Sequence, residues 1–194
     1  MAKAYFATQI YKAQLPVTAN AALGRVCLAI ARDDLAGRRW AKAHGYRGYT
    51  SYASLDDLPR RAPEFAELVA RIDPHVRRFA RDLQFARTRL ALDSLWLNVM
   101  EPGAVHAAHI HPHSAISGTY YVALPKGASA IRFEDPRLPL MMAAPVKRPT
   151  AREKPFVTLA PKPGTLLLWE SWLRHDVPQN DARKPRISVS FNYR

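Results

Sequence analysis

The sequence predicts a mainly β protein, an antiparallel jelly roll with a helical extension packed on it. Up to about residue 89 the apolar residues recur every three or four positions, which is the period of a helix. Beyond residue 90 they alternate, which is the period of a strand, and turns rather than helices separate the candidate strands. We therefore expect one globule, with a helical extension and tyrosine-rich loop at residues 1–89 and a catalytic β core at residues 90–194.

The extension is expected to contain two amphipathic helices. The first begins at Asn20, whose side chain can cap it, and extends through Asp33, and Gly37 breaks the apolar pattern before Trp40. The second begins at Pro63, and its Asp73-Pro74 pair predicts a kink or a restart. Between them, residues 45–52 form a loop rich in tyrosine, which either shapes a binding surface or fastens a long connection.

Short alternating segments bounded by Gly, Pro and Asp predict the strands of the core. These segments are residues 95–99, 117–124, 131–133, 156–159, 165–169 and 187–193. The basic, proline-rich segment 141–154 is expected to be a long loop that crosses one mouth of the barrel, where loops often select the substrate.

Length and composition fit one folded domain, since 48% of the 194 residues are hydrophobic and 23% are charged. The single cysteine, Cys27, lies among apolar residues, which indicates a buried thiol and a reducing compartment. The N-terminus lacks the apolar run of a secretory signal, and no apolar stretch is long enough to span a membrane. We expect a cytoplasmic protein with no membrane partner.

The net charge of +13 is unevenly distributed. Residues 1–95 carry 16 basic and 9 acidic groups, residues 96–146 carry 3 of each, and residues 147–194 carry 10 basic and 4 acidic groups. Such basic flanks can attract an acidic protein or a nucleic acid. Because arginine-rich helical faces are more often simply solvated, and few aromatic residues are interleaved here, we do not expect a nucleic-acid partner.

Four of the seven histidines lie within eight residues, at His106, His109, His111 and His113. In a strand, residues two apart project from the same face, so His109 and His111 would point together at one ion. His175, 66 residues after His109, follows a late strand that a jelly roll brings beside an early one. The alternative is a hydrogen-bonded core histidine or a surface loop rich in histidine.

Polar residues alternate along the last predicted strand. Ile187, Val189, Phe191 and Tyr193 share one face, which leaves Arg186, Ser188, Ser190 and Asn192 on the other. Such a polar face suits a cavity, and an arginine inside a barrel requires an anion. A guanidinium matches a carboxylate in bidentate fashion, and the Ser188 hydroxyl can add a hydrogen bond. The alternative is an exposed edge strand with Arg186 in solvent.

Together these features resemble a known family, the 2-oxoglutarate/iron(II) oxygenases, and within it a bacterial group of 2OG-Fe(II) oxygenases. The motifs of the core are His109-x-His111, the strand 116–122, Pro163-Gly164, Trp172-Leu173-x-His175 and Arg186-x-Ser188. Further similar segments, which extend the likeness over nearly the whole chain, are residues 45–52, Trp96-x-Asn98, residues 133–137 and residues 190–192. The resemblance implies a double-stranded β-helix, an iron(II) ion, 2-oxoglutarate as cosubstrate and O2 as oxidant. It further implies hydroxylation of a substrate, with release of succinate and CO2.

The resemblance also implies roles for individual residues. His109 and His175 match two metal ligands, and Arg186 and Ser188 match the pair that binds the distal carboxylate of 2-oxoglutarate. The family normally has a carboxylate where this chain has His111. Either His111 is the third ligand, which we prefer, or a carboxylate takes that place, with Asp135, Glu134 and Glu170 as candidates. The residues expected in the pocket wall are Trp96, Asn98, Tyr120 and Tyr121, of which Asn98 and Tyr120 are expected beside the cosubstrate.

Three other functions remain open from the sequence. Gly103, His109-x-His111 and Pro163-Gly164 also resemble cupin motifs, which would give a metal enzyme that needs no 2-oxoglutarate. Three histidines can hold zinc with a bound water, as in a hydrolase or lyase. The third function is a basic module that binds nucleic acid or protein through its surface. The prime substrate is not evident, although the basic flanks slightly favour an acidic or macromolecular one.

Overall fold

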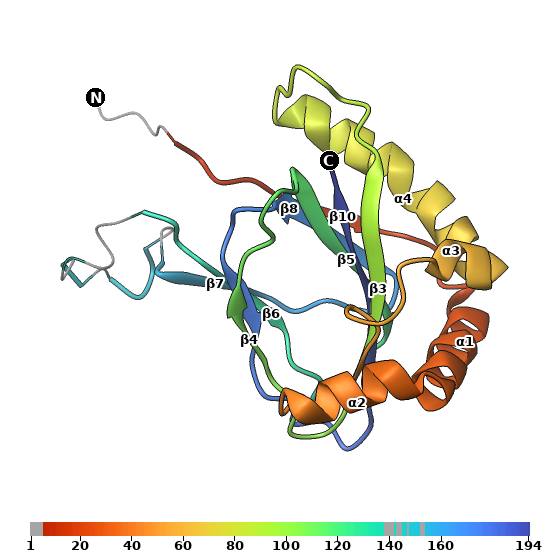
Figure 1. Ribbon diagram of the computed structural model, residues 1–194. Coiled ribbons are helices and arrows are strands. Elements are labelled where there is room, and N and C mark those ends of the chain that lie inside the picture. Colours follow the sequence, from red (N-terminus) through yellow and green to blue (C-terminus); the bar gives the residue numbers. More distant parts are fainter. Residues whose placement is uncertain (1–5, 138–141, 143–144, 147, 152–153) are drawn as a thin grey trace.

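The computed structural model describes residues 6–137, 142, 145–146, 148–151 and 154–194. Its core is two antiparallel sheets (Figure 1). The larger sheet has six strands in the order β1-β8-β5-β10-β3-β2, and the smaller has four in the order β4-β9-β6-β7. The strands are β1 (Ile10–Gln14), β2 (Gly48–Thr50), β3 (Leu92–Met100), β4 (His106–His109), β5 (Ile116–Ala123), β6 (Ile131–Glu134), β7 (Phe156–Leu159), β8 (Thr165–Glu170), β9 (His175–Val177) and β10 (Arg186–Tyr193). This arrangement confirms the expected mainly β class.

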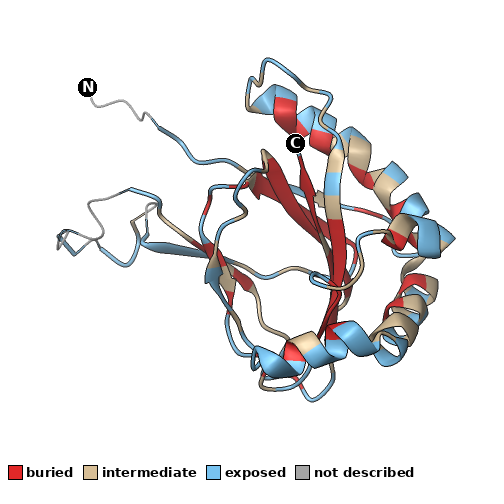
Figure 2. Ribbon diagram, viewed as in Figure 1, coloured by how far each residue is buried: buried red, intermediate tan, exposed pale blue. Residues whose placement is uncertain are grey.

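Helices cover the outer face of the larger sheet, and their red stripes in Figure 2 mark the sides that are buried there. They are α1 (Asn20–Asp33), α2 (Leu35–Ala43), α3 (Leu58–Arg61) and α4 (Pro63–Asp82). The buried residues of α4, among them Phe65, Ile72 and Phe79, recur at helical spacing and join one apolar core with the sheet. Each such fully buried side chain contributes about 1.5–3 kcal/mol to folding. In the part of the chain that the structure describes, no helix combines the length and apolarity needed to cross a bilayer.

Two local expectations for the helices are wrong, although the first helix spans Asn20–Asp33 as expected. Asn20 is the first residue of α1 but does not cap it, because its amide donates to the Val122 carbonyl oxygen at 2.8 Å. Gly37 lies inside α2, and the break falls at Asp34, whose carboxylate caps α2 by accepting from the Gly37 N–H at 3.0 Å. The chain stays helical through Pro74, since apolar residues on both sides of it pack on the sheet.

The extension contributes strands as well as helices. The strand β1 pairs with β8 and β2 pairs with β3, so both edges of the larger sheet come from residues before 90. The extension and the core therefore share one sheet. Part of the segment 141–154, expected to be a loop over one mouth, lies outside the described residues.

Successive side chains of the central strands point alternately into two interiors, the apolar core under the helices and the pocket between the two sheets. In β10, Ile187, Val189 and Phe191 belong to the core between sheet and helices. The intervening Arg186, Ser188 and Ser190 line a pocket between the two sheets, as the alternation predicts. The larger sheet is therefore apolar towards the helices and partly polar towards the smaller sheet.

We expect Gly118→Ala to destabilise the fold by about 1–3 kcal/mol. Gly118 lies in β5, where an added Cβ would meet the Phe191 ring at 2.5 Å and the Leu168 side chain at 2.6 Å. Gly24→Ala is the matched control, since its Cβ would lie 3.7 Å from Val122 in a helix and should stabilise by about 0.5–1 kcal/mol. Urea unfolding measures both, and equal stability of the two variants would contradict the packing described here.

Candidate metal centre

The pairing of two short strands brings the first two histidines together. β4 runs antiparallel to β9 with His109 directly opposite His175, and their ring centroids lie 4.4 Å apart. A register shift between His106 and His109 interrupts this pairing, so the spacing of the strand is irregular just before the site. Neighbouring strands of a sheet lie about 5 Å apart, which is close enough for two imidazoles to share one ion.

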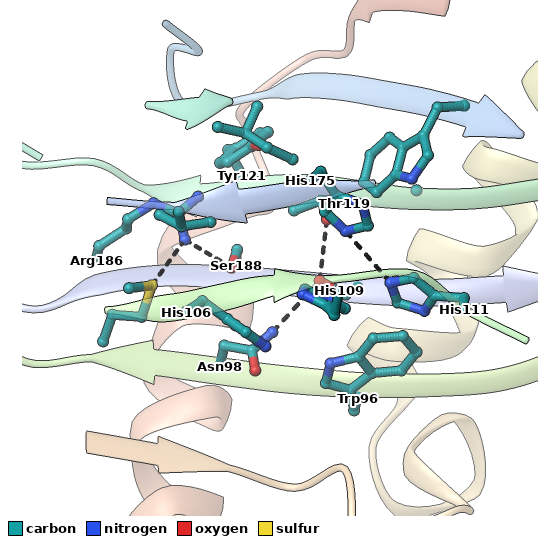
Figure 3. Close-up of a pocket in the computed structure, with 16 residues that line it drawn as sticks. Trp96, Asn98, His106, His109, His111, Thr119, Tyr121, His175, Arg186 and Ser188 are labelled. Carbon is teal, nitrogen blue, oxygen red and sulfur yellow. Dashed lines mark hydrogen bonds between the residues drawn. The ribbon is translucent and has the colours of Figure 1, made fainter. Parts of the chain in front are cut away.

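His111 joins the pair from outside the strand. The strand β4 ends at His109, and the His111 N–H donates to the Ser171 carbonyl oxygen at 2.9 Å. This bond fastens the segment after β4 to the turn after β8 and brings the His111 Nε2 atom to 3.3 Å from that of His175. The three histidines thus offer nitrogen atoms that all lie within 4.8 Å of one another (Figure 3). The expected grouping is present, but its expected cause, two histidines on one strand face, is wrong.

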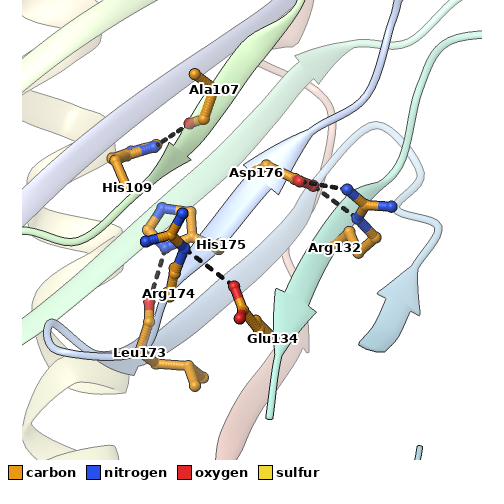
Figure 4. Close-up of polar contacts among 8 residues, drawn as sticks. All are labelled: Ala107, His109, Arg132, Glu134, Leu173, Arg174, His175 and Asp176. Carbon is orange, nitrogen blue, oxygen red and sulfur yellow. Dashed lines mark hydrogen bonds and ion pairs between the residues drawn. The ribbon is translucent and has the colours of Figure 1, made fainter. Parts of the chain in front are cut away.

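Backbone carbonyls orient two of the rings. The Nδ1 atom of His109 lies 2.7 Å from the Ala107 oxygen, and that of His175 lies 2.9 Å from the Leu173 oxygen (Figure 4). Since a carbonyl oxygen only accepts, both Nδ1 atoms carry the proton. Each Nε2 atom is therefore left with a lone pair for a metal ion.

Burial keeps these histidines neutral. Burial, followed by repulsion from His109, lowers the pKa of His175 to about 3 and that of His111 to about 4. The pKa of His109 is also lowered by burial. At neutral pH all three side chains are thus in the form that binds metals.

The candidate carboxylates lie elsewhere. Glu134 forms an ion pair with Arg174 at 3.0 Å (Figure 4), and Asp135 forms one with Arg137. Glu170, at the end of β8, also lies outside the group of three. Among the described residues, the grouping able to hold a metal ion contains three histidines and no carboxylate.

A pocket extends from the histidines towards Arg186, and both sheets line it (Figure 3). The lining residues are Trp96, Asn98, Met100, His106, His109, His111, Gly118, Thr119, Tyr121, Ile131, Trp169, His175, Val177, Arg186, Ser188 and Ser190. Sequence reasoning missed His106, whose ring stacks on His109 at 4.7 Å, and Trp169, whose ring meets His175 edge-on at 4.7 Å. The fourth histidine of the window, His113, is exposed and does not line the pocket.

Arg186 forms the opposite end of the pocket. It is 2% exposed, and its Nη1 atom donates to the Ser188 hydroxyl at 3.3 Å and towards the Met100 sulfur at 3.4 Å. The guanidinium also lies over the Tyr121 ring, 5.0 Å from its centroid. Its Nε atom has no partner, and no carboxylate of the described residues pairs with it. The expected cavity-facing arginine is therefore present, with hydrogen-bonding capacity to spare.

The expected role of Tyr120 beside the cosubstrate is wrong, whereas Asn98 does line the pocket. Tyr120 faces the helices, where its hydroxyl donates to the Asn20 side chain at 2.5 Å. Tyr121 occupies the pocket instead, opposite Ser188 in the register. The signal for this was the polar alternation of Ser117 and Thr119, which places Tyr121 rather than Tyr120 on the cavity face.

Comparison with known proteins gives one family and one fold. A family model described as "Putative 2OG-Fe(II) oxygenase" matches residues 94–192. No curated protein matches the sequence. The fold is similar to that of a prolyl-4-hydroxylase from Pseudomonas putida, with 16% identity and a TM-score of 0.62 over 96% of this chain and 92% of that chain.

Two further solved structures share the fold. The epimerase SnoN in complex with Fe3+, alpha ketoglutarate and nogalamycin RO is 13% identical, with a TM-score of 0.66 over 96% of this chain and 78% of that one. EctD from S. alaskensis is 16% identical, with a TM-score of 0.62 over 96% of this chain and 72% of that chain. An oxidoreductase of the 2OG-Fe(II) oxygenase family from Burkholderia pseudomallei is 17% identical over 61% of this chain, and the chain spans only 50% of its length. The TM-score of that match, 0.46, is too low for the two folds to be compared.

We expect the metal-free protein to lose stability as the pH falls from about 6.5 to about 4. An unfolded histidine takes up a proton near pH 6.5, whereas His111 and His175 stay neutral in the fold down to pH values of about 4 and 3. The unfolded state then binds more protons, so the free energy of unfolding falls with pH, by up to about 1.4 kcal/mol per pH unit for each histidine.

Denaturant unfolding between pH 7 and pH 4 measures this slope. His175→Phe, which keeps an aromatic ring at the site, should have a shallower slope than the unaltered protein. His113→Asn, at an exposed position with a φ of 67° that Asn tolerates, is the control and should keep the full slope. A slope unchanged by His175→Phe would show that this histidine is not held neutral by the fold.

Proposed function

The chain belongs to the 2OG-Fe(II) oxygenase family, and from this premise we propose that it hydroxylates a substrate at an iron(II) ion held by His109, His111 and His175, with 2-oxoglutarate bound by Arg186 and Ser188. Membership of the family makes it an oxygenase of the 2-oxoglutarate- and iron(II)-dependent kind. The residue roles, the hydroxylation and the release of succinate and CO2 are the proposed part.

One observation carries the proposal: a buried guanidinium, which has no carboxylate partner among the described residues, shares a pocket with three neutral histidines. A buried charge is strongly unfavourable unless it is paired and hydrogen-bonded. A dicarboxylate that reaches the metal with one end and Arg186 with the other satisfies this requirement. The residues present therefore fit 2-oxoglutarate, whose two ends carry carboxylates.

The ligand set also fits iron(II). Imidazole is a good ligand for iron, and three protein ligands leave coordination positions open. When bound, iron(II) and 2-oxoglutarate supply the activation of O2. Because His111 replaces a carboxylate, the three ligands contribute no negative charge, so the attraction between the metal ion and an anionic cosubstrate is stronger here than with the usual ligand set.

The protein's own residues position the reactants and limit the access of water to the histidines. The Ser188 hydroxyl, already bonded to Arg186, is placed to donate to the same carboxylate. Asn98 has a buried side-chain oxygen without a partner, and its amide donates to Ser190 at 3.3 Å, so it can orient a polar group in the middle of the pocket. Trp96 stacks on His111 at 5.6 Å and Trp169 packs on His175, which shields both ligands from solvent.

A cupin-type enzyme without 2-oxoglutarate and a zinc hydrolase would share the histidines, and each leaves Arg186 without a role. In a basic binding module, neither the three histidines nor Arg186 would have a role. The prime substrate stays open. Screening succinate release against amino acids, peptides and cell extract is the direct route to it.

We expect Arg186→Met to raise the KM for 2-oxoglutarate by about 100-fold or more, because a buried charged hydrogen-bonding pair is lost. Arg186→Lys, which keeps the charge but not the planar fork, should lie between Arg186→Met and the unaltered protein. Succinate release from 2-oxoglutarate under O2 with iron(II) measures the effect. Turnover that is indifferent to Arg186→Met would favour the cupin-type alternative.

We expect His111→Ala to abolish tight iron(II) binding and His111→Asp to retain it, since Asp restores an oxygen ligand that suits iron(II). His113→Asn is again the control and should bind one iron(II) per chain, as the unaltered protein does. Anaerobic metal analysis after dialysis gives the stoichiometry. Full binding by His111→Ala would show that a group other than His111 supplies the third ligand.

A further inference from the structure

Tyr46, in the extension, is directed towards the core by the end of α2. Gly45 adopts the left-handed conformation at φ 66°, the Tyr46 N–H donates to the Ala41 oxygen at 2.9 Å, and the Gly45 N–H donates to the Lys42 oxygen at 3.2 Å. These two bonds and the left-handed glycine define a Schellman motif, which ends the helix and reverses the chain. Tyr46 therefore turns back under α2, towards the interior between the sheets.

The Tyr46 side chain packs directly behind residues that line the pocket. Its ring meets His106 edge-on at 5.8 Å and packs against the apolar cluster that contains Met100, Ala104 and Tyr121. Its hydroxyl is buried without a hydrogen-bond partner among the described residues. Burial raises the pKa of Tyr46 and the nearby positive charge of Arg186 partly offsets this, so the phenol stays neutral and able to donate.

Three buried donors that have no acceptor among the described residues thus lie in the wall at this end of the pocket or directly behind it: the hydroxyls of Tyr46 and Tyr121 and the Nε atom of Arg186. Arg186 can donate to a phenol oxygen but cannot accept, so at least one of the two hydroxyl protons is left without an acceptor within this group. Burial of polar groups without partners is unfavourable, and their proximity to one another points to a shared acceptor that a ligand supplies. A carboxylate has about four acceptor positions, enough for the guanidinium and both phenols.

We propose that the Tyr46 hydroxyl donates a hydrogen bond to the carboxylate that Arg186 binds, so that the helical extension completes the cosubstrate pocket. This inference rests on the proposed function. It concerns a residue well before residue 94, where the match to the family model begins. Tyr46 is then a binding residue supplied from outside the β core.

The test is Tyr46→Phe, which removes one hydroxyl and keeps the ring that packs on His106. Calorimetry under nitrogen, on protein loaded with iron(II), should show 2-oxoglutarate bound about 10- to 100-fold more weakly, the range expected for a hydrogen bond to a charged group. Oxalate, which chelates the metal and is too short to reach Arg186, should bind the variant and the unaltered protein equally.

Tyr49→Phe is the matched control. It makes the same change three residues later, at a hydroxyl that already donates to Asp34 at 2.7 Å. It should leave 2-oxoglutarate affinity unchanged and lower the midpoint of thermal unfolding. Tyr46→Phe should not lower that midpoint in the ligand-free protein, because its hydroxyl has no partner to lose in the described part of the chain.

Several outcomes would overturn the inference. Equal 2-oxoglutarate affinity for Tyr46→Phe and the unaltered protein would exclude the hydrogen bond while leaving the proposed function intact. Equal losses for 2-oxoglutarate and oxalate, or a lower unfolding midpoint without ligand, would show that Tyr46 acts through the fold. If the unaltered protein itself does not bind 2-oxoglutarate, both the inference and the proposed function fail.

Discussion

The pairing of His109 in β4 with His175 in β9 is the constraint on which the metal centre depends. Both strands are short and belong to the smaller sheet, so few backbone hydrogen bonds hold them in register. The His111–Ser171 bond adds a third attachment, from the turn that leaves the larger sheet. The three candidate ligands are therefore fastened to both sheets, and the proposed metal site can form only when the two sheets close against each other.

The alternation of side chains along β10 links the packing of the apolar core to the lining of the pocket. Val189 and Phe191 pack on the helices, and Arg186 and Ser188 face the pocket from the same strand. A slip of one residue would expose the apolar set to the pocket and bury the arginine among the helices. The apolar core thus holds Arg186 in its position, although none of the buried residues of that core lines the pocket.

Much of the fold was predictable because alternation is a strong signal in long, half-buried strands. The predicted segments 117–124 and 187–193 match β5 and β10 within one residue. The strands β1, β2, β4 and β9 lie outside the predicted segments, although β6 and β7, with four residues each, were predicted. The pairing partners of β1, β2, β4 and β9 lie far away in the sequence, and alternation within a segment does not reveal them. The same limit explains the error about His111, which is positioned by a backbone bond to Ser171 and not by strand periodicity.

The tyrosines show a second limit. The alternation of Ser117 and Thr119 already places Tyr121 on the cavity face, but the register shift that sets Tyr121 opposite Ser188 is visible only in the pairing of β5 with β10. Tyr46 was assigned only to a tyrosine-rich loop, because its approach to Arg186 depends on how α2 ends. Local sequence patterns carry no information on such long-range contacts.

The position of β10 bears on how the protein folds. It is the last strand along the chain, yet it lies between β5 and β3 near the middle of the larger sheet (Figure 1). Until β10 inserts, no strand joins β3 to β5. The larger sheet then also lacks the strand that carries Arg186 and Ser188 into the pocket wall. Such non-local closure slows folding and leaves strand edges exposed meanwhile. The proposed anion pocket is thus complete only after β10 has inserted between β3 and β5, and iron bound at the proposed ligands before that step would be exposed to solvent.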